Sequence, residues 1–77
     1  MAEDVLSQAS AWGFVCHSEP NGTWQILPQQ RKERWKLQLE EDRWLLIVGN
    51  VPQINFYPHE AIAFLELRRS SLEHNKS

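Results

Sequence analysis

Apolar and polar residues alternate along most of the chain, in short segments that each contain a tryptophan. The tryptophans are Trp12, Trp24, Trp35 and Trp44, in a chain of 77 residues. Alternation with a period of two is typical of β-strands, whose successive side chains point to opposite faces of a sheet. The pattern predicts an antiparallel sheet with one tryptophan in each strand, but it does not decide whether the rings face the core or a ligand.

The first predicted hairpin joins residues 12–18 to residues 23–27. Its loop carries Glu-Pro-Asn-Gly at residues 19–22. Proline suits the first central position of a type I turn, and glycine suits the left-handed position that follows, so a three-residue loop with a bulge is favoured. This loop sets Cys16 opposite Ile26 and places the apolar residues of both strands on one face.

The second predicted hairpin pairs residues 35–40 with residues 43–48. A two-residue turn at Glu41-Asp42 sets Trp35 opposite Val48, Leu37 opposite Leu46, Leu39 opposite Trp44, and Glu40 opposite Arg43. A register slip of one residue would move every apolar side chain to the wrong face. Because Glu-Asp is not a preferred sequence for a tight turn, a longer loop is the alternative.

A third hairpin is predicted at Gly49-Asn50, as a type II′ turn into an edge strand that contains Pro52. The preceding strand is apolar on its second face as well, through Leu45 and Ile47, so we expect it to be central or covered on both sides. With an even-numbered loop, Ile54 and Phe56 join Leu45 and Ile47. A bulge at Gly49 or Pro52 would instead move them to the tryptophan face.

A helix is predicted from Pro58 to Arg69, because proline suits the first helical position, Glu60 complements the helix dipole, and apolar residues recur along the run. The fold class is therefore α+β: an antiparallel meander of four or five strands followed by one C-terminal helix on the face of Trp35 and Trp44. Residues 11–69 form the predicted domain. We expect residues 1–10 and 70–77 to be flexible, with at most one helical turn at residues 5–9.

The composition and charge of the chain argue against several classes of protein function. The formal net charge is −2 and the isoelectric point is near 5.8, which argues against a dedicated nucleic-acid binder. Cys16 is the single cysteine, so no intrachain disulfide forms and a reducing compartment is favoured. Because the apolar runs are too short to cross a bilayer and no secretory leader is present, we expect a soluble, cytoplasmic protein.

The residues that commonly carry catalysis do not form a recognisable site. Cys16 and His17 are neighbours on a strand and point to opposite faces, so they cannot bind one metal or act as nucleophile and base together. The carboxylates of residues 40–42 belong to a solvated turn, and no glycine-rich phosphate loop is present. We therefore expect no catalytic residue, no metal ligand, no cofactor and no enzyme activity.

Two surfaces are candidates for binding. The possible contacts for a partner or a nucleic acid are Arg31, Lys32, Arg34, Lys36, Arg43, Trp12 and Trp24. This basic segment has three interpretations: a solvated loop, a docking patch for an acidic protein, or a single-stranded nucleic-acid site in which rings stack on bases. Alternation places Lys36 on the opposite face from Trp35, which weakens the nucleic-acid interpretation. The candidate self-association surface consists of Leu45, Ile47, Ile54 and Phe56.

The segments WGFV at residues 12–15 and ERWKLQLEEDRWLLIVGNVPQINFYPHEAIAFLELRR at residues 33–69 resemble a family of small uncharacterised cyanobacterial proteins. That family has no assigned activity, so the resemblance implies only a cytoplasmic protein of a photosynthetic bacterium. The architecture is also similar to the sheet-plus-helix dimers of some single-strand-binding transcriptional regulators, although shared architecture does not carry function across. From the sequence we expect a non-enzymatic protein-binding or assembly module that can form a homodimer. The alternative is single-stranded nucleic-acid binding.

Overall fold

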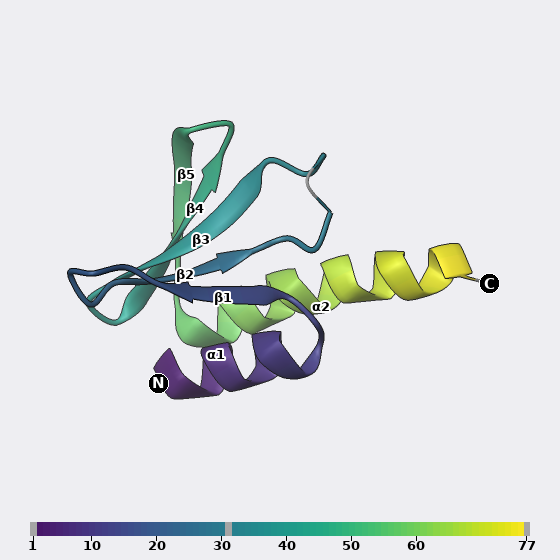
Figure 1. Ribbon diagram of the computed structural model, residues 1–77, viewed down its shortest axis with the longest axis horizontal. Helices are drawn as coiled ribbons and strands as arrows, with labels where there is room; N and C mark the ends of the chain where they lie inside the picture. The colour runs from purple at the N-terminus through teal and green to yellow at the C-terminus, as the bar shows by residue number, and fades with distance from the viewer. Residues whose placement is uncertain (1, 31, 77) are drawn as a thin grey trace.

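A five-stranded antiparallel sheet carries two helices on one of its faces (Figure 1). The computed structural model describes the backbone of residues 2–30 and 32–76 and the side chains of residues 4–30 and 32–69. Its elements are α1 (Ala2–Ala11), β1 (Val15–Ser18), β2 (Trp24–Leu27), β3 (Trp35–Glu40), β4 (Arg43–Val48), β5 (Val51–Phe56) and α2 (Pro58–Lys76). The strands lie in the order β1-β2-β3-β4-β5, which confirms the predicted α+β meander with a C-terminal helix.

The β1–β2 hairpin has the predicted register. Cys16 pairs with Ile26, and the Glu19 amide donates to the Thr23 carbonyl oxygen at 2.7 Å. Gly22 closes the turn by donating to the Glu19 carbonyl oxygen at 2.9 Å, with a φ of +91° that favours glycine. The loop chemistry and the apolar pattern therefore agree with each other.

The β3–β4 hairpin also has the predicted register, from Trp35 opposite Val48 to Glu40 opposite Arg43. Its turn contains only Glu41 and Asp42, and Glu41 takes a φ of 61°. Left-handed backbone is unfavourable for glutamate. The strand pairing on both sides of the turn holds it there, so the longer loop is not needed.

The β4–β5 hairpin differs from its predicted form in two ways. Gly49 and Asn50 both have positive φ, 58° and 69°, so the turn is type I′ rather than type II′. A β-bulge also breaks the register: Ile47 pairs with Pro52, whereas Leu46 pairs with Ile54. The register predicted for an even-numbered loop was therefore wrong. The alternative with a bulge predicted the correct face, because Ile54 lies on the tryptophan face.

Helix α2 begins as its sequence predicts. The Glu60 carboxylate accepts a hydrogen bond from the Tyr57 amide at 2.9 Å, and the Tyr57 carbonyl accepts one from the Ala61 amide at 2.9 Å. The Glu60 side chain thus satisfies the amide of Tyr57 just before the helix, as in one half of a capping box, and the Ala61–Tyr57 bond is the first backbone bond of the helix. Phe64 packs edge-on against Trp35, with ring centroids 5.1 Å apart, so α2 covers the predicted face. The helix continues to Lys76, past the Arg69 end expected from the sequence.

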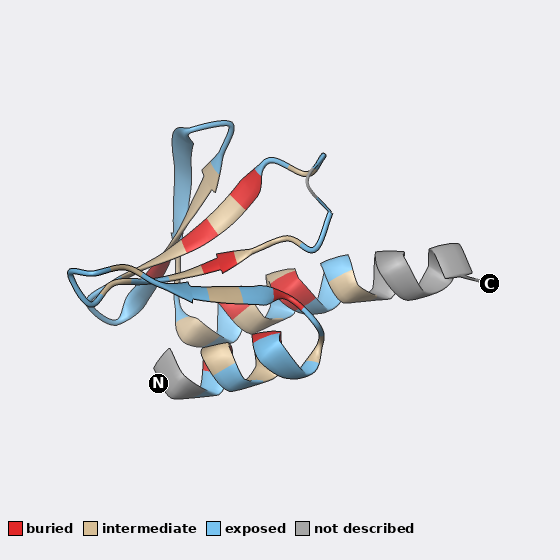
Figure 2. Cartoon of the chain, viewed as in Figure 1, coloured by how far each residue is buried: buried red, intermediate tan, exposed pale blue. Residues whose placement is uncertain are grey.

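Helix α1 corrects the expectation that residues 1–10 are flexible. It spans Ala2–Ala11, lies beside α2, and has Val5 and Ala9 completely buried (Figures 1 and 2). The Phe14 amide donates to the Ala9 carbonyl oxygen at 2.9 Å and so fixes the end of the helix. Trp12 consequently lies in the turn after α1 and not in a strand, so the prediction of one tryptophan per strand fails for it.

The core lies between the sheet and the two helices. Its buried apolar residues are Val5, Ala9, Phe14, Ile26, Trp35, Leu37, Trp44, Ala61 and Leu65 (Figure 2). The other two tryptophans are only partly buried: Trp24 is 37% exposed and Trp12 is half-buried. Among the described residues, no acceptor pairs with the buried Nε1 of Trp44.

Candidate binding surface on the open sheet face

One face of the sheet has no helix over it in the described part of the chain, because α1 and α2 both lie on the other side (Figure 1). We call it the outer face. It is formed by alternate residues of the strands, namely Val15, His17, Gln25, Leu27, Lys36, Gln38, Glu40, Arg43, Leu45, Ile47, Pro52 and Asn55. The interior position expected for β4 is confirmed, but its second face has no covering element among the described residues.

Polar and apolar residues are interspersed on the outer face, where Gln38 pairs with Leu45 and Lys36 pairs with Ile47. Gln25 Nε2 donates to Gln38 Oε1 at 3.1 Å, and Gln38 Nε2 donates to Glu40 Oε2 at 3.0 Å. This row ties β2 to β3 by side chains as well as by backbone. Leu27, Leu45 and Ile47 are only half-buried although they belong to interior strands. Apolar side chains are therefore accessible on this face, with Leu27 and Ile47 on the two strands that flank Lys36.

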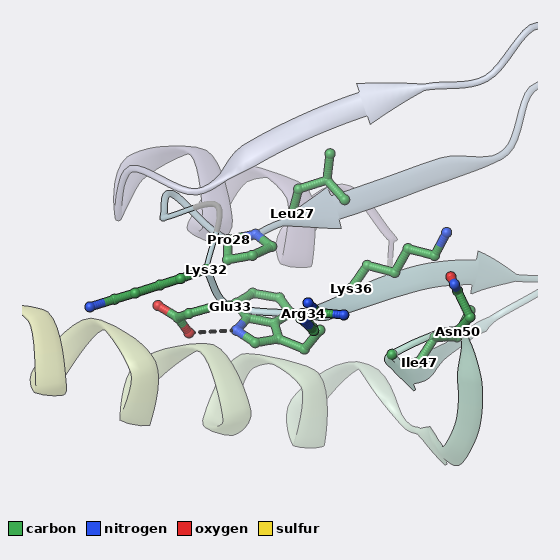
Figure 3. Close-up of a pocket in the computed structure, with 10 residues that line it drawn as sticks. Leu27, Pro28, Lys32, Glu33, Arg34, Lys36, Ile47 and Asn50 are labelled. Atoms are coloured by element: carbon green, nitrogen blue, oxygen red, sulfur yellow. Dashed lines mark hydrogen bonds between the residues drawn. The ribbon is translucent and has the colours of Figure 1, made fainter.

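A hollow of about 620 Å³ lies at the end of the outer face where β2 ends and β3 begins. It is lined by Leu27, Pro28, Lys32, Glu33, Arg34, Trp35, Lys36, Ile47, Gly49 and Asn50 (Figure 3). The Gly49 amide donates to the Arg34 carbonyl oxygen at 3.0 Å and so holds the β4–β5 turn against the start of β3. The hollow thus joins residues from three separate stretches of the chain.

The lining of the hollow is positively charged. Lys32, Arg34 and Lys36 contribute three cations, and Glu33 is the one acid among the lining residues. Glu33 Oε1 accepts a hydrogen bond from Trp35 Nε1 at 2.8 Å, so its carboxylate is turned toward the indole (Figure 3). Lys32 and Lys36 extend to opposite ends of the hollow in the same view. The cations are therefore spread along the hollow rather than gathered at one point.

The other predicted contact residues do not join this hollow. Arg43 lies at the opposite end of the β3–β4 hairpin, where its Nη2 donates to the Tyr57 hydroxyl at 3.0 Å and its guanidinium carbon lies 4.2 Å from the centre of the Tyr57 ring. Arg43 lies away from Lys36, because the two-residue turn pairs Arg43 with Glu40 and Lys36 is paired with Ile47. Arg31 lies outside the described residues.

Trp12 and Trp24 are on the other side of the sheet from the outer face. Trp24 shares its face with the buried Ile26, and Trp12 lies under the guanidinium of Arg69, whose central carbon is 5.2 Å from the ring. Neither ring lines the hollow. The cations of the hollow were therefore predicted from the sequence. The sequence analysis missed Leu27, Pro28 and the Gly49-Asn50 turn, because these residues reach the hollow only through the order of strands in the sheet.

The four residues of the predicted self-association surface are divided between two faces. Leu45 and Ile47 belong to the outer face. Ile54 and Phe56 lie on the helix side, where the Phe56 ring is 5.6 Å from the ring of Phe64. The β-bulge in β5 causes this division, so the four residues do not form one continuous patch.

The neighbouring side chains of Cys16 and His17 have different surroundings. Burial raises the pKa of the Cys16 thiol, and its sulfur lies 3.7 Å from the Leu6 carbonyl oxygen. His17 Nε2 is paired with Glu19 Oε2 at 3.0 Å on an exposed strand. Among the described side chains, those of residues 4–30 and 32–69, no three from histidine, cysteine, aspartate or glutamate gather in a way that could hold a metal ion.

Neither helix, within its described residues, combines the length and the apolar character needed to cross a bilayer. The sequence matches no protein-family model, and comparison with curated proteins and with solved structures gave no match.

Proposed function

We propose that the protein is a non-enzymatic, cytoplasmic binding module that holds an acidic, extended segment of a partner protein on its outer face. The observation that carries this proposal is the hollow, where Lys32, Arg34 and Lys36 meet the half-buried Leu27 and Ile47. Charge complementarity of this kind selects and orients a partner. Leu27 and Ile47, on either side of Lys36, supply the desolvated contact area that gives affinity.

An extended segment fits the arrangement of the cations. Arg34 and Lys36 are two residues apart, on either side of the inward-facing Trp35, and alternate residues of an extended chain point to the same side. Side chains on the same side of an extended chain recur about every 6.6 Å. A partner segment with acidic residues at alternate positions would match this spacing and place its intervening side chains along Leu27 and Ile47.

The same cations are the basis of the nucleic-acid alternative, but the aromatic rings are wrongly placed for it. Single-stranded nucleic-acid sites combine cations with exposed rings on which bases stack. Trp35 is the one aromatic residue that lines the hollow, and it is only 5% exposed, with its ring edge-on to Phe64. The arrangement therefore favours a peptide.

Lys36→Glu is expected to weaken binding of an acidic peptide about tenfold, because reversing one half-buried charge changes the interaction by about 1.4 kcal/mol. The probe is a peptide of alternating glutamate and leucine, titrated into the isotopically labelled protein while backbone amide shifts are followed. Shifts are expected at Leu27, Lys36, Ile47 and Gly49. Arg43→Glu is the matched control, since it changes the net charge equally but lies outside the hollow.

Three outcomes would contradict the proposal. The first is a peptide that shifts no amide of the hollow at millimolar concentration. The second is equal weakening by Lys36→Glu and Arg43→Glu, which would indicate attraction to overall charge alone. The third is an oligonucleotide that binds where the peptide does not, with an affinity that falls steeply with salt, as expected for nucleic-acid binding.

A further inference from the structure

A second, smaller cavity lies on the helix side of the sheet, between α2 and the strands β3 and β4. We call it the groove, and its volume is about 240 Å³. Glu33, Arg34 and Trp35 line both the groove and the hollow of the outer face. In Figure 3, Glu33 and its hydrogen bond to Trp35 lie on the side of the hollow nearest α2. The two cavities therefore meet at the start of β3.

The groove has an apolar wall that is open to solvent. Leu46 and Val48 of β4 belong to it, the first half-buried and the second 42% exposed. Phe64 of α2 completes the wall, but its ring already contacts those of Trp35 and Phe56, with centroids 5.1 and 5.6 Å away. An incoming group therefore meets a mainly aliphatic surface. The volume is below the range of about 300–1,000 Å³ that small-molecule sites occupy, so the groove has room for one or two side chains rather than for a cofactor.

The charged residues of the groove favour an acidic occupant. Arg34 and Arg68 line it, and Glu33 is the one carboxylate among its lining residues. That carboxylate accepts the hydrogen bond from Trp35 Nε1, and within the described part of the chain it forms no ion pair with either arginine. The central carbon of the Arg68 guanidinium lies 5.1 Å from the centre of the Phe64 ring, which holds this cation beside the apolar wall. The groove therefore has the same character as the hollow, with cations next to accessible aliphatic side chains.

We propose that the groove is the second half of the peptide site, an inference that rests on the proposed function. The acidic segment in the hollow continues across the start of β3 and inserts one leucine-sized side chain against Leu46 and Val48. A carboxylate on the neighbouring residue of the segment lies between Arg34 and Arg68. Charge complementarity selects this occupant, and an aliphatic anchor buried in a pocket is the kind of contact that dominates affinity. Arg34 lines both cavities and so serves the segment where it crosses from one to the other.

Peptides of two lengths, with both ends blocked, test this extension on the full chain. The short peptide is Glu-Leu-Glu-Leu-Glu, which spans about 16 Å when extended and is matched to the hollow. Two long peptides add glycine, leucine and glutamate, about 10 Å more, at the amino end or at the carboxyl end. Because a bound segment runs in one direction, we expect one of the two to bind about tenfold more tightly than the short peptide. It should also shift the backbone amides of Val48, Phe64 and Arg68. A version with glycine in place of the added leucine has the same charge and should lose the gain.

Arg68→Glu is expected to remove the tenfold gain and to leave the affinity for the short peptide nearly unchanged. Arg68 is exposed and lines the groove but not the hollow. Arg43→Glu is the matched control, since it changes the net charge equally but lines neither cavity that the segment occupies, and the gain should persist. Lys36→Glu should weaken the short and the long peptides alike.

Long peptides that bind no more tightly than the short one, and shift no amide of the groove, overturn the extension and leave the proposed function intact. A gain that survives Arg68→Glu also overturns it, as does an equal gain from the glycine version, which would indicate attraction to charge alone. If neither the short nor the long peptides shift an amide of the hollow, the proposed function fails and the extension fails with it.

Discussion

Val5→Asp is expected to destabilise the domain by at least about 3 kcal/mol, because it places an unpaired carboxylate in a desolvated site. Val5 is completely buried in the core, on the helix that packs beside α2. For a domain of this size such a loss lowers the melting temperature by about 15 °C. Urea unfolding followed by tryptophan fluorescence measures the change in the free energy of unfolding.

Ser7→Asp is the matched control for that substitution. It introduces the same side chain on the exposed face of α1, two residues further along, and is expected to change the free energy of unfolding by less than about 0.5 kcal/mol. Equal effects of the two substitutions would mean that α1 does not form part of the core. The comparison therefore tests the largest difference between the structure and the sequence-based expectation.

Local patterns were sufficient for the first two hairpins. In the β1–β2 hairpin the turn residues 19–22 determine the loop, and in the β3–β4 hairpin the alternation from Trp35 to Val48 allows only one register that buries the apolar set. Both depend on residues that are close in sequence. Turn chemistry and a period of two therefore suffice, even though Glu41 must adopt an unfavourable left-handed conformation.

Helix α1 could not be predicted because its stability comes from the far end of the chain. Its ten residues form a helix too short to be stable alone in water. Val5 and Ala9 contribute to stability only when α2 packs beside them. The same contact explains why the prediction for Trp12 was wrong. Its sequence pattern is that of an alternating strand, but Trp12 lies in the turn that follows α1.

The binding surfaces were predictable to different degrees for a related reason. Lys32, Arg34 and Lys36 are close together in sequence, so their clustering could be predicted. The separation of Arg43 from them depends on the length of one turn. The positions of Ile54 and Phe56 depend on a single extra residue in β5, and both registers satisfied the local pattern. Packing of Phe56 on Phe64 of α2 favours the bulged register, and this contact is not local.

The four tryptophans differ in how much they contribute to the free energy of unfolding, and alanine substitutions measure the difference. Trp44→Ala is expected to cost about 3–5 kcal/mol, because Trp44 is completely buried and its removal leaves a large cavity. Trp24→Ala removes a ring that is already 37% exposed and should cost about two-thirds as much, in proportion to the area it buries. The free energy of unfolding in urea, followed by far-ultraviolet circular dichroism, measures both.

Trp44→Phe separates packing from hydrogen bonding at the same site. The Nε1 of Trp44 is buried without an acceptor among the described residues, so phenylalanine removes an unsatisfied donor and keeps most of the apolar volume. An unsatisfied buried donor costs about 1–3 kcal/mol, which offsets part of the lost packing. Trp44→Phe should therefore be much milder than Trp44→Ala. A phenylalanine variant as unstable as the alanine variant would mean that the indole N–H is hydrogen-bonded in solution, to an ordered water or another group, and that the core around β4 holds a polar contact.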